Sequence, residues 1–103
     1  MTRVLVPLAQ GCEELETVTI IDILRRAEIE VVAAGLEDGP VTGSRGVRLL
    51  PDMSLDDALK SDYDMVALPG GLPGSDNLGA DNRVTGLLRS MNESGRFIGA
   101  VCA

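Results

Sequence analysis

Short apolar runs alternate with helical segments along this chain, and the alternation limits the folds open to it. Two runs rich in β-branched residues, 2–9 and 29–36, flank segment 13–27, in which apolar residues recur at helical spacing. A strand, a helix and a second strand in this order predict a βαβ unit, whose two strands are parallel. We therefore expect an α/β sandwich with a mostly parallel sheet and helices on both faces.

The middle of the chain adds a hairpin and a short helix. Segment 39–52 contains two extended pieces around the turn Gly43–Gly46, which predicts a small antiparallel hairpin outside the main sheet. Ser54, followed three residues later by Asp57, is typical of a helix N-terminus.

Two further strands and a helix complete the prediction. Buried strands are expected within 63–71 and over 96–102, which gives about four parallel strands in all. Between them, Asp81 is expected to cap a helix that stops at Gly95. The apolar face of this helix is predicted to consist of Val84, Leu87, Leu88 and Met91.

The helix predicted over 13–27 carries more apolar surface than one stripe needs. Two isoleucines, Ile20 and Ile23, widen this surface and suggest a second apolar neighbour such as a partner subunit. The stripe itself is predicted to consist of Leu15, Val18, Ile21 and Leu24.

Charge and composition exclude several classes of function. The net charge is −7 with a single lysine, which disfavours binding to nucleic acid or to an anionic membrane surface. The first apolar run is short, carries Arg3 and lacks the features of a signal peptide, and no stretch approaches a membrane span, so we expect a cytoplasmic protein. With no histidine, the chain offers no Ser-His-Asp triad, no Cys-His pair and no histidine-ligated metal by itself. A general base must be a carboxylate, unless another polypeptide provides it.

Three predicted strand ends carry the most distinctive residues: "AQGCEELE", "LPGG" and "AVCA". In parallel sheets such ends meet at one rim, where Glu16, Gly70, Gly71 and Cys102 would converge. Cys102 is either a small buried hydrophobe or a nucleophile at a strand end, flanked by the small residues that a tight turn needs.

The neighbours of Cys102 on this rim also admit two interpretations. Glu16 is either an exposed first-turn glutamate or a carboxyl that moves protons for the cysteine. Gly70 and Gly71 form either a simple turn or backbone donors for an oxyanion. Cys12 is interpreted as a bystander with the potential of an exposed thiol. The glycines match neither the dinucleotide nor the phosphate-loop pattern, so no cofactor is predicted.

The motifs "EELETV", "SRGV", "LPGG" and "AVCA", in this order, resemble the ThiJ/PfpI superfamily. The resemblance is closest to the branch of the parkinsonism-associated deglycase and its bacterial YajL-like relatives. It implies a flavodoxin-like sandwich, a homodimer, Cys102 as the oxidisable nucleophile, Glu16 as its carboxyl partner, and Gly70 and Gly71 as backbone donors. Because the family continues for nearly as many residues again, residues 1–103 are expected to be the N-terminal part of one domain, completed by a C-terminal fragment or chain.

Two functions are compatible with these residues. The first is a cofactor-free glyoxalase or deglycase in which Cys102 adds to a small α-oxoaldehyde or acts on a glycated adduct, and Glu16 moves the proton. The alternative is a redox-sensing holdase chaperone in which Cys102 is oxidised without turnover. Peptidase activity lacks an identifiable base in this chain.

Overall fold

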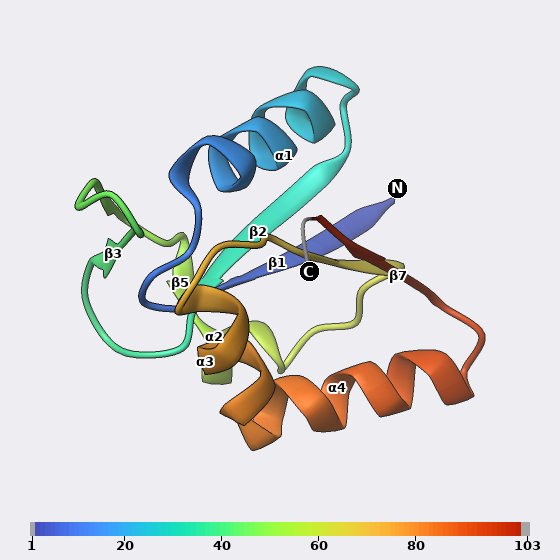
Figure 1. Ribbon diagram of the computed structural model, residues 1–103. Helices are drawn as coiled ribbons and strands as arrows, with labels where there is room; N and C mark the ends of the chain where they lie inside the picture. Colours follow the sequence, from blue (N-terminus) through green and yellow to red (C-terminus); the bar gives the residue numbers. More distant parts are fainter. Residues whose placement is uncertain (1, 102–103) are drawn as a thin grey trace.

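A five-stranded parallel sheet runs through the centre of the computed structural model, which describes residues 2–101 (Figure 1). The strand order is β5-β2-β1-β6-β7, and every neighbouring pair is parallel. The strands are β1 (Arg3–Leu8), β2 (Glu30–Gly35), β5 (Met53–Ser54), β6 (Met65–Leu68) and β7 (Phe97–Ala100). The mostly parallel sheet predicted from the alternation is confirmed, although about four strands were predicted and the two-residue β5 was not.

Helices cover both faces of this sheet, as predicted. One face packs against α1, and the other packs against α2, α3 and α4 (Figure 1). The helices are α1 (Glu14–Arg26), α2 (Leu55–Ala58), α3 (Gly74–Ala80) and α4 (Asn82–Glu93). None of the helices among residues 2–101 has the length and apolar character that crossing a membrane requires.

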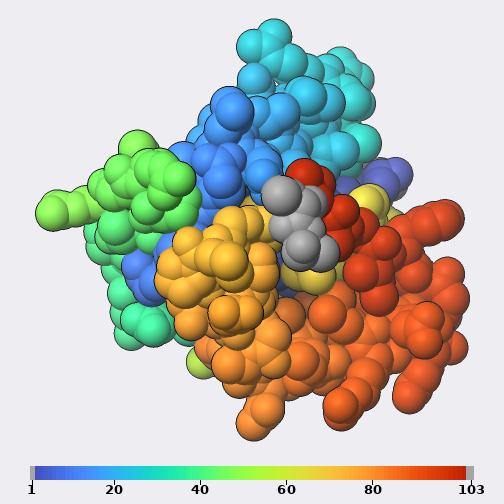
Figure 2. All heavy atoms as spheres, in the orientation of Figure 1, coloured from blue at the N-terminus to red at the C-terminus, as the bar shows by residue number. Residues whose placement is uncertain are grey.

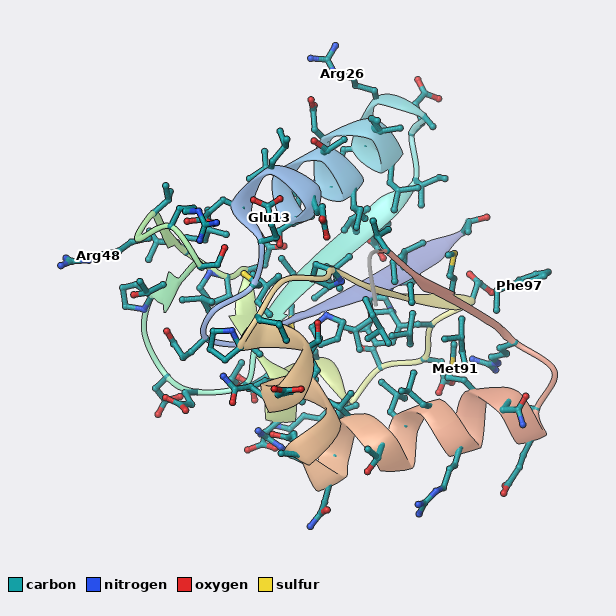
Figure 3. The ribbon with its side chains drawn as sticks, viewed as in Figure 1. Glu13, Arg26, Arg48, Met91 and Phe97 are labelled. Carbon is teal, nitrogen blue, oxygen red and sulfur yellow. The ribbon has the colours of Figure 1, made fainter. Side chains whose placement is uncertain are left out.

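The two faces of the sheet bury alternate residues of the same strands, because side chains along a strand point in opposite directions. On β1, Leu5 faces α4 and its neighbours, whereas Val4 and Val6 face α1. On the face that Leu5 occupies, Met91 of α4 points toward the sheet (Figure 3). Phe97 of β7, which pairs with Met65 of the α1 face, points outward. The strands therefore form the shared centre of two apolar layers.

A separate hairpin, formed by β3 (Val41–Thr42) and β4 (Arg48–Leu49), projects beside the start of α1. Its two strands are antiparallel, as predicted. Figure 3 shows Arg48 at its far edge, pointing away from the molecule, as Arg26 does at the other end of α1.

The predicted apolar stripe of α1 is wrong in two positions. Leu15 and Val18 lie 74% and 50% exposed, and Thr17 is the fully buried residue of this helix. Ile20, Ile21 and Leu24 pack partly against the core, so the contact face is rotated relative to the prediction. A helix with apolar residues on nearly every side does not determine its own rotation; the packing against β1 and β2 selects it.

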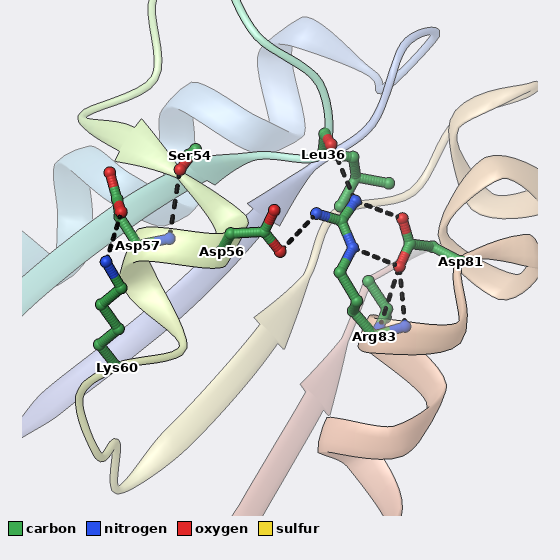
Figure 4. A network of polar contacts seen from close by, with 8 residues as sticks. Leu36, Ser54, Asp56, Asp57, Lys60, Asp81 and Arg83 are labelled. Carbon is green, nitrogen blue, oxygen red and sulfur yellow. Dashed lines mark hydrogen bonds and ion pairs between the residues drawn. The ribbon is translucent and has the colours of Figure 1, made fainter.

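An arginine ties the start of α4 to α2 and to the residue after β2 (Figure 4). Arg83 donates two hydrogen bonds to the carboxylate of Asp81, at 2.7 and 3.1 Å. It also donates to Asp56 of α2 at 3.0 Å and to the carbonyl of Leu36 at 2.8 Å. Asp81 caps α4, as predicted, by accepting from the amides of Arg83 and Val84. The predicted cap of α2 is confirmed as well, since the amide of Asp57 donates to Ser54 Oγ.

Candidate functional site

Two of the predicted rim residues are in direct contact at the carboxyl ends of β1 and β6. The backbone N–H of Gly70 donates to Oε1 of Glu16 at 3.0 Å, and both residues are at least partly buried. Within residues 2–101, Oε2 of Glu16 has no hydrogen-bond partner. Glu16 is therefore a fixed carboxylate with one oxygen bonded to the backbone. In this arrangement the Gly70 N–H, predicted as an oxyanion donor, faces Glu16.

The carbonyl of the same glycine is also engaged. The backbone N–H of Glu13 donates to the Gly70 oxygen at 2.9 Å. The side chain of Glu13, at the N-terminus of α1 (Figure 3), accepts from the N–H of Glu16 at 2.9 Å. Both sides of the Gly70 residue are thus bonded to the first turn of α1.

Gly71 allows the loop after β6 to approach α1 this closely. It has φ +97°, and a Cβ atom there would lie 2.6 Å from the Glu13 nitrogen. A side chain at position 71 is excluded on both counts. This contact accounts for the glycine independently of the donor role predicted for its N–H.

The start of α3 approaches the loop after β1 in a similar way. A Cβ at Gly74 would lie 2.6 Å from the Cα of Cys12, and the Gly74 N–H donates to the Gly11 carbonyl at 3.1 Å. In the space-filling view the hairpin (green), the start of α1 (blue) and α3 (gold) form one continuous surface (Figure 2). The loop that leads into α1, and so to Glu16, is therefore packed on more than one side.

Cys102 lies outside the described residues, and only the backbone leading toward it can be followed. Strand β7 pairs with β6 through Leu68 and Ala100, and the Val101 N–H donates to the Leu68 carbonyl at 3.0 Å. The last described residue thus runs beside the strand that ends two residues before Gly70. The role of Cys102 stays a prediction.

Cys12 differs from its interpretation as an exposed thiol. Its side chain is fully buried, in the cluster on the α1 face of the sheet. Burial raises the pKa of this thiol, more than a hydrogen bond with Thr17 lowers it. Because Gly74 and Ser44 both pack or bond to its backbone, the loop encloses it. Cys12 is a structural residue here.

Glu14 joins α1 to the hairpin, a role that the sequence did not indicate. Its Oε2 accepts from the backbone N–H groups of Arg45 and Val47, at 2.8 and 3.1 Å, and its Oε1 accepts from Ser44 Oγ at 3.2 Å. Partial desolvation opposes ionisation, but these hydrogen bonds outweigh it and lower the pKa of Glu14. The carboxylate therefore stays ionised and holds the hairpin turn.

The predicted interface residues differ in exposure. Ile23 is 57% exposed, whereas Ile20 is half-buried against the sheet. Ile20 also lines an apolar groove of about 340 Å³ between α1 and the β6–β7 edge, together with Met65 and Gly99. Among residues 2–101, no three His, Cys, Asp or Glu side chains are grouped so that they could hold a metal ion.

The chain is similar to proteins of a known family. Residues 2–103 match the DJ-1/PfpI family. The chain belongs to this family. The resemblance proposed from "EELETV", "LPGG" and "AVCA" is thereby confirmed, and the flavodoxin-like fold expected from it agrees with the structural relatives of the chain.

Two DJ-1/PfpI relatives show how far the similarity extends. The chain is 48% identical over 100 residues to protein dj-1beta of Drosophila melanogaster, covering 96% of this chain and 54% of that protein. The solved structure of oxidised Toxoplasma gondii DJ-1 superposes with a TM-score of 0.96 at 41% identity, covering 100% of this chain and 56% of that one. The chain thus spans about half the length of these relatives.

A third DJ-1/PfpI relative is named for an enzymatic activity. The chain is 35% identical over 94 residues to a Caenorhabditis elegans protein named a glutathione-independent glyoxalase, covering 91% of this chain and 50% of that protein.

Proposed function

We propose that this chain supplies the nucleophile and the proton-transfer carboxylate of a cofactor-free glyoxalase or deglycase acting on small 2-oxoaldehydes or their adducts. The observation that carries the proposal is the Glu16–Gly70 hydrogen bond of 3.0 Å, which fixes a carboxylate at the carboxyl edge of the sheet. A proton-transfer group must be held within reach of the reacting atoms, and a side chain anchored to the backbone meets this need. The Caenorhabditis elegans relative named a glyoxalase supports the choice of substrate class.

The proposed reaction has three steps: addition, proton transfer and hydrolysis. The Cys102 thiolate adds to the aldehyde carbon, and the carbonyl oxygen takes up a proton, which gives a hemithioacetal. Oε2 of Glu16 then removes the proton from this carbon to form an enediol and returns it to the neighbouring carbon, which leaves a thioester of a 2-hydroxy acid. Water finally hydrolyses the thioester, so that the 2-hydroxy acid leaves and the thiol is restored. The substrate is both oxidised and reduced internally.

Removal of an aldehyde from a glycated amine or thiol would begin in the same way. The Cys102 thiol gives its proton to Glu16, the resulting thiolate attacks the adduct carbon, and the amine or thiol departs as the leaving group with that proton. The later steps are unchanged. Deglycation therefore extends the same chemistry to a second class of substrate.

Substitution of the two cysteines in the full-length protein tests the proposal. Cys102→Ser is expected to abolish methylglyoxal consumption, because the thiolate is the nucleophile. Cys12→Ser is the matched control, since Cys12 is buried and enclosed by the loop, and it is expected to retain turnover per folded molecule. Turnover of Cys102→Ser at the wild-type rate would refute the mechanism.

A second candidate function is redox sensing coupled to holdase chaperone activity. It is favoured by the Toxoplasma gondii relative, whose structure is described as oxidised. In this case two equivalents of peroxide oxidise the Cys102 thiolate to a sulfinic acid and are reduced to water. A protein that suppresses client aggregation only after this oxidation, and consumes no methylglyoxal, would favour the second candidate over the first.

Two protein partners belong to the same proposal. Among the described residues, strand β7 is an edge of the sheet. Its Phe97 and Ile98, and Val101 directly after it, are 74%, 41% and 42% exposed. We expect a C-terminal segment or chain, corresponding to the half of the relatives that this chain does not match, to cover this edge.

We also expect the outer face of α1, with Ile23, to contact a second copy of the protein in the cytoplasm. Sedimentation of the full-length protein tests this contact: Ile23→Asp should convert a dimer to a monomer, and an unchanged dimer would place the interface elsewhere.

A further inference from the structure

We infer that Glu13 is the positioning residue of Glu16, acting through a capping box into which the Gly70 residue is inserted. This inference rests on the proposed role of Glu16 in proton transfer. It assigns to Glu13 and Gly71 a function that neither the spacing of the glutamates nor the Pro-Gly-Gly turn indicates.

In an ordinary capping box, two side chains satisfy the first turn of a helix reciprocally. The N-cap side chain accepts from the N–H of the third helical residue, and the glutamate at that position reaches back to the N-cap N–H. The first half is present here, because Glu13 accepts from the N–H of Glu16 at 2.9 Å. Glu16 occupies the third helical position of α1.

In the second half of the capping box, Gly70 lies between the Glu13 N–H and the Glu16 carboxylate, which do not bond to each other directly. The N-cap N–H of Glu13 donates to the Gly70 carbonyl at 2.9 Å, and the Gly70 N–H donates to the Glu16 carboxylate at 3.0 Å. Three hydrogen bonds thus form a closed ring through Glu13, Gly70 and Glu16. Residues 54 positions apart in sequence are joined by it.

This ring fixes both the main chain and the side chain of Glu16. The Glu13 carboxylate holds the Glu16 nitrogen, and the Gly70 N–H holds Oε1, so the second oxygen has a defined direction. Loss of the Glu13 side chain leaves the Glu16 N–H without this acceptor and allows the first turn to fray. Glu16 would then lose its position even though its own side chain is intact.

Gly71 lies outside the ring but permits the close contact on which the ring depends. A Cβ at this position would lie 2.6 Å from the Glu13 nitrogen and 2.9 Å from the Glu13 Cβ. The Glu13 nitrogen is the donor to the Gly70 carbonyl, so a side chain at position 71 would push apart the two segments that the ring joins. The glycine requirement at 71 is therefore a requirement of the positioning device.

Backbone NMR of the full-length protein tests the inference without any need for activity. In Glu13→Ala we expect the Gly70 amide proton to move toward the shift of a water-exposed glycine, and its exchange protection to fall about fivefold. Glu13→Ser, which restores an N-cap oxygen, is expected to return both values toward those of the wild type. Under saturating methylglyoxal, kcat should fall about fivefold in Glu13→Ala and recover in Glu13→Ser.

A matched control separates this effect from a general loss of stability. Ser54→Ala removes the cap of α2 and should leave the Gly70 amide unchanged. If Glu13→Ala does not fold, Glu13→Gly replaces it, because glycine is tolerated at an N-cap yet lacks the acceptor. A wild-type Gly70 amide in the folded Glu13 variant would overturn the inference. A wild-type protein without turnover, but with a Gly70 amide that responds to Glu13→Ala, would refute the proposed function and leave the ring intact.

Discussion

The carboxylate of Glu14 lies against Gly43 of the hairpin and occupies the space that a Cβ atom at that position would need. From there it accepts hydrogen bonds from the N–H groups of Arg45 and Val47. Helix α1 therefore holds the hairpin through one ionised side chain, next to the turn that carries Glu16.

The Glu14 contact predicts a specific pH dependence of stability. The pKa of Glu14 is lowered in the folded state, so its contribution is complete above the ordinary value of 4.5 and is lost as the pH falls through the lower, folded value. Glu14→Gln is therefore expected to lower the urea midpoint at neutral pH and to differ less from the wild type at about pH 3. Glu93→Gln, at the exposed end of α4, serves as the control. An equal loss at both pH values would argue against an ionised clamp.

The Arg83 network predicts that lysine cannot replace this arginine. A lysine cannot contact Asp81 at two points while also reaching Asp56 and the Leu36 carbonyl. Because the Arg83 side chain is 34% exposed, solvent screening limits the expected loss of unfolding free energy in Arg83→Lys to about 1 kcal/mol.

The Arg83–Asp81 pair also predicts that the stability of the fold depends on pH. Hydrogen bonds from Arg83 lower the pKa of Asp81, so the stabilisation weakens as the pH falls through the folded value. Arg26→Lys is the control, since Arg26 is 77% exposed, and should change little. Equal effects of the two substitutions in denaturant unfolding would contradict the assigned role of Arg83.

One glycine inside α4 and one just after its end predict opposite effects of alanine. Gly86 lies inside the helix with open space around it, so Gly86→Ala is expected to stabilise the protein by about 0.5–1 kcal/mol. Gly95 also has open space, but its φ of +73° disfavours a side chain, and Gly95→Ala should destabilise it. Thermal unfolding of both variants is the measurement, and a loss of stability in Gly86→Ala would show that this position contacts something in the whole protein.

The two cysteines are expected to differ in oxidation. Cys12 is buried and its pKa is raised, which keeps it in the unreactive thiol form. Mild peroxide should therefore add about 32 Da, two oxygen atoms, to Cys102 alone. Peptide mass spectrometry locates the modification. Equal oxidation of both residues would mean that Cys102 has no special reactivity.

The elements that carry strong local patterns were predictable from the sequence. The β-branched runs predicted β1 and β2, and Ser54 and Asp81 predicted the caps of α2 and α4. Helix α3 was missed because its sequence, GSDNLGA, has little helical propensity; contacts such as the one between Gly74 and Cys12 hold it instead.

The meeting of two rim residues was predictable from the sequence, whereas the hydrogen bonds around them were not. Convergence of parallel strand ends brings Glu16 and Gly70 together, and this contact is found. The hydrogen bonds of Glu13 and Glu14 depend on segments that are distant in sequence, and three similar glutamates in one turn give no local sign of which partner each will take. Burial of Cys12 likewise follows from tertiary packing.

The most direct test of the proposed mechanism separates nucleophilic addition from proton transfer in the full-length protein. Glu16→Gln keeps a side chain of the same size but lacks the base. It is expected to form the adduct of methylglyoxal on Cys102, visible by intact mass, while kcat falls by about 10²-fold or more. Glu93→Gln should match the wild type in both measurements. Wild-type turnover in Glu16→Gln would contradict the account, because the carboxylate held by Gly70 would then have no part in the reaction.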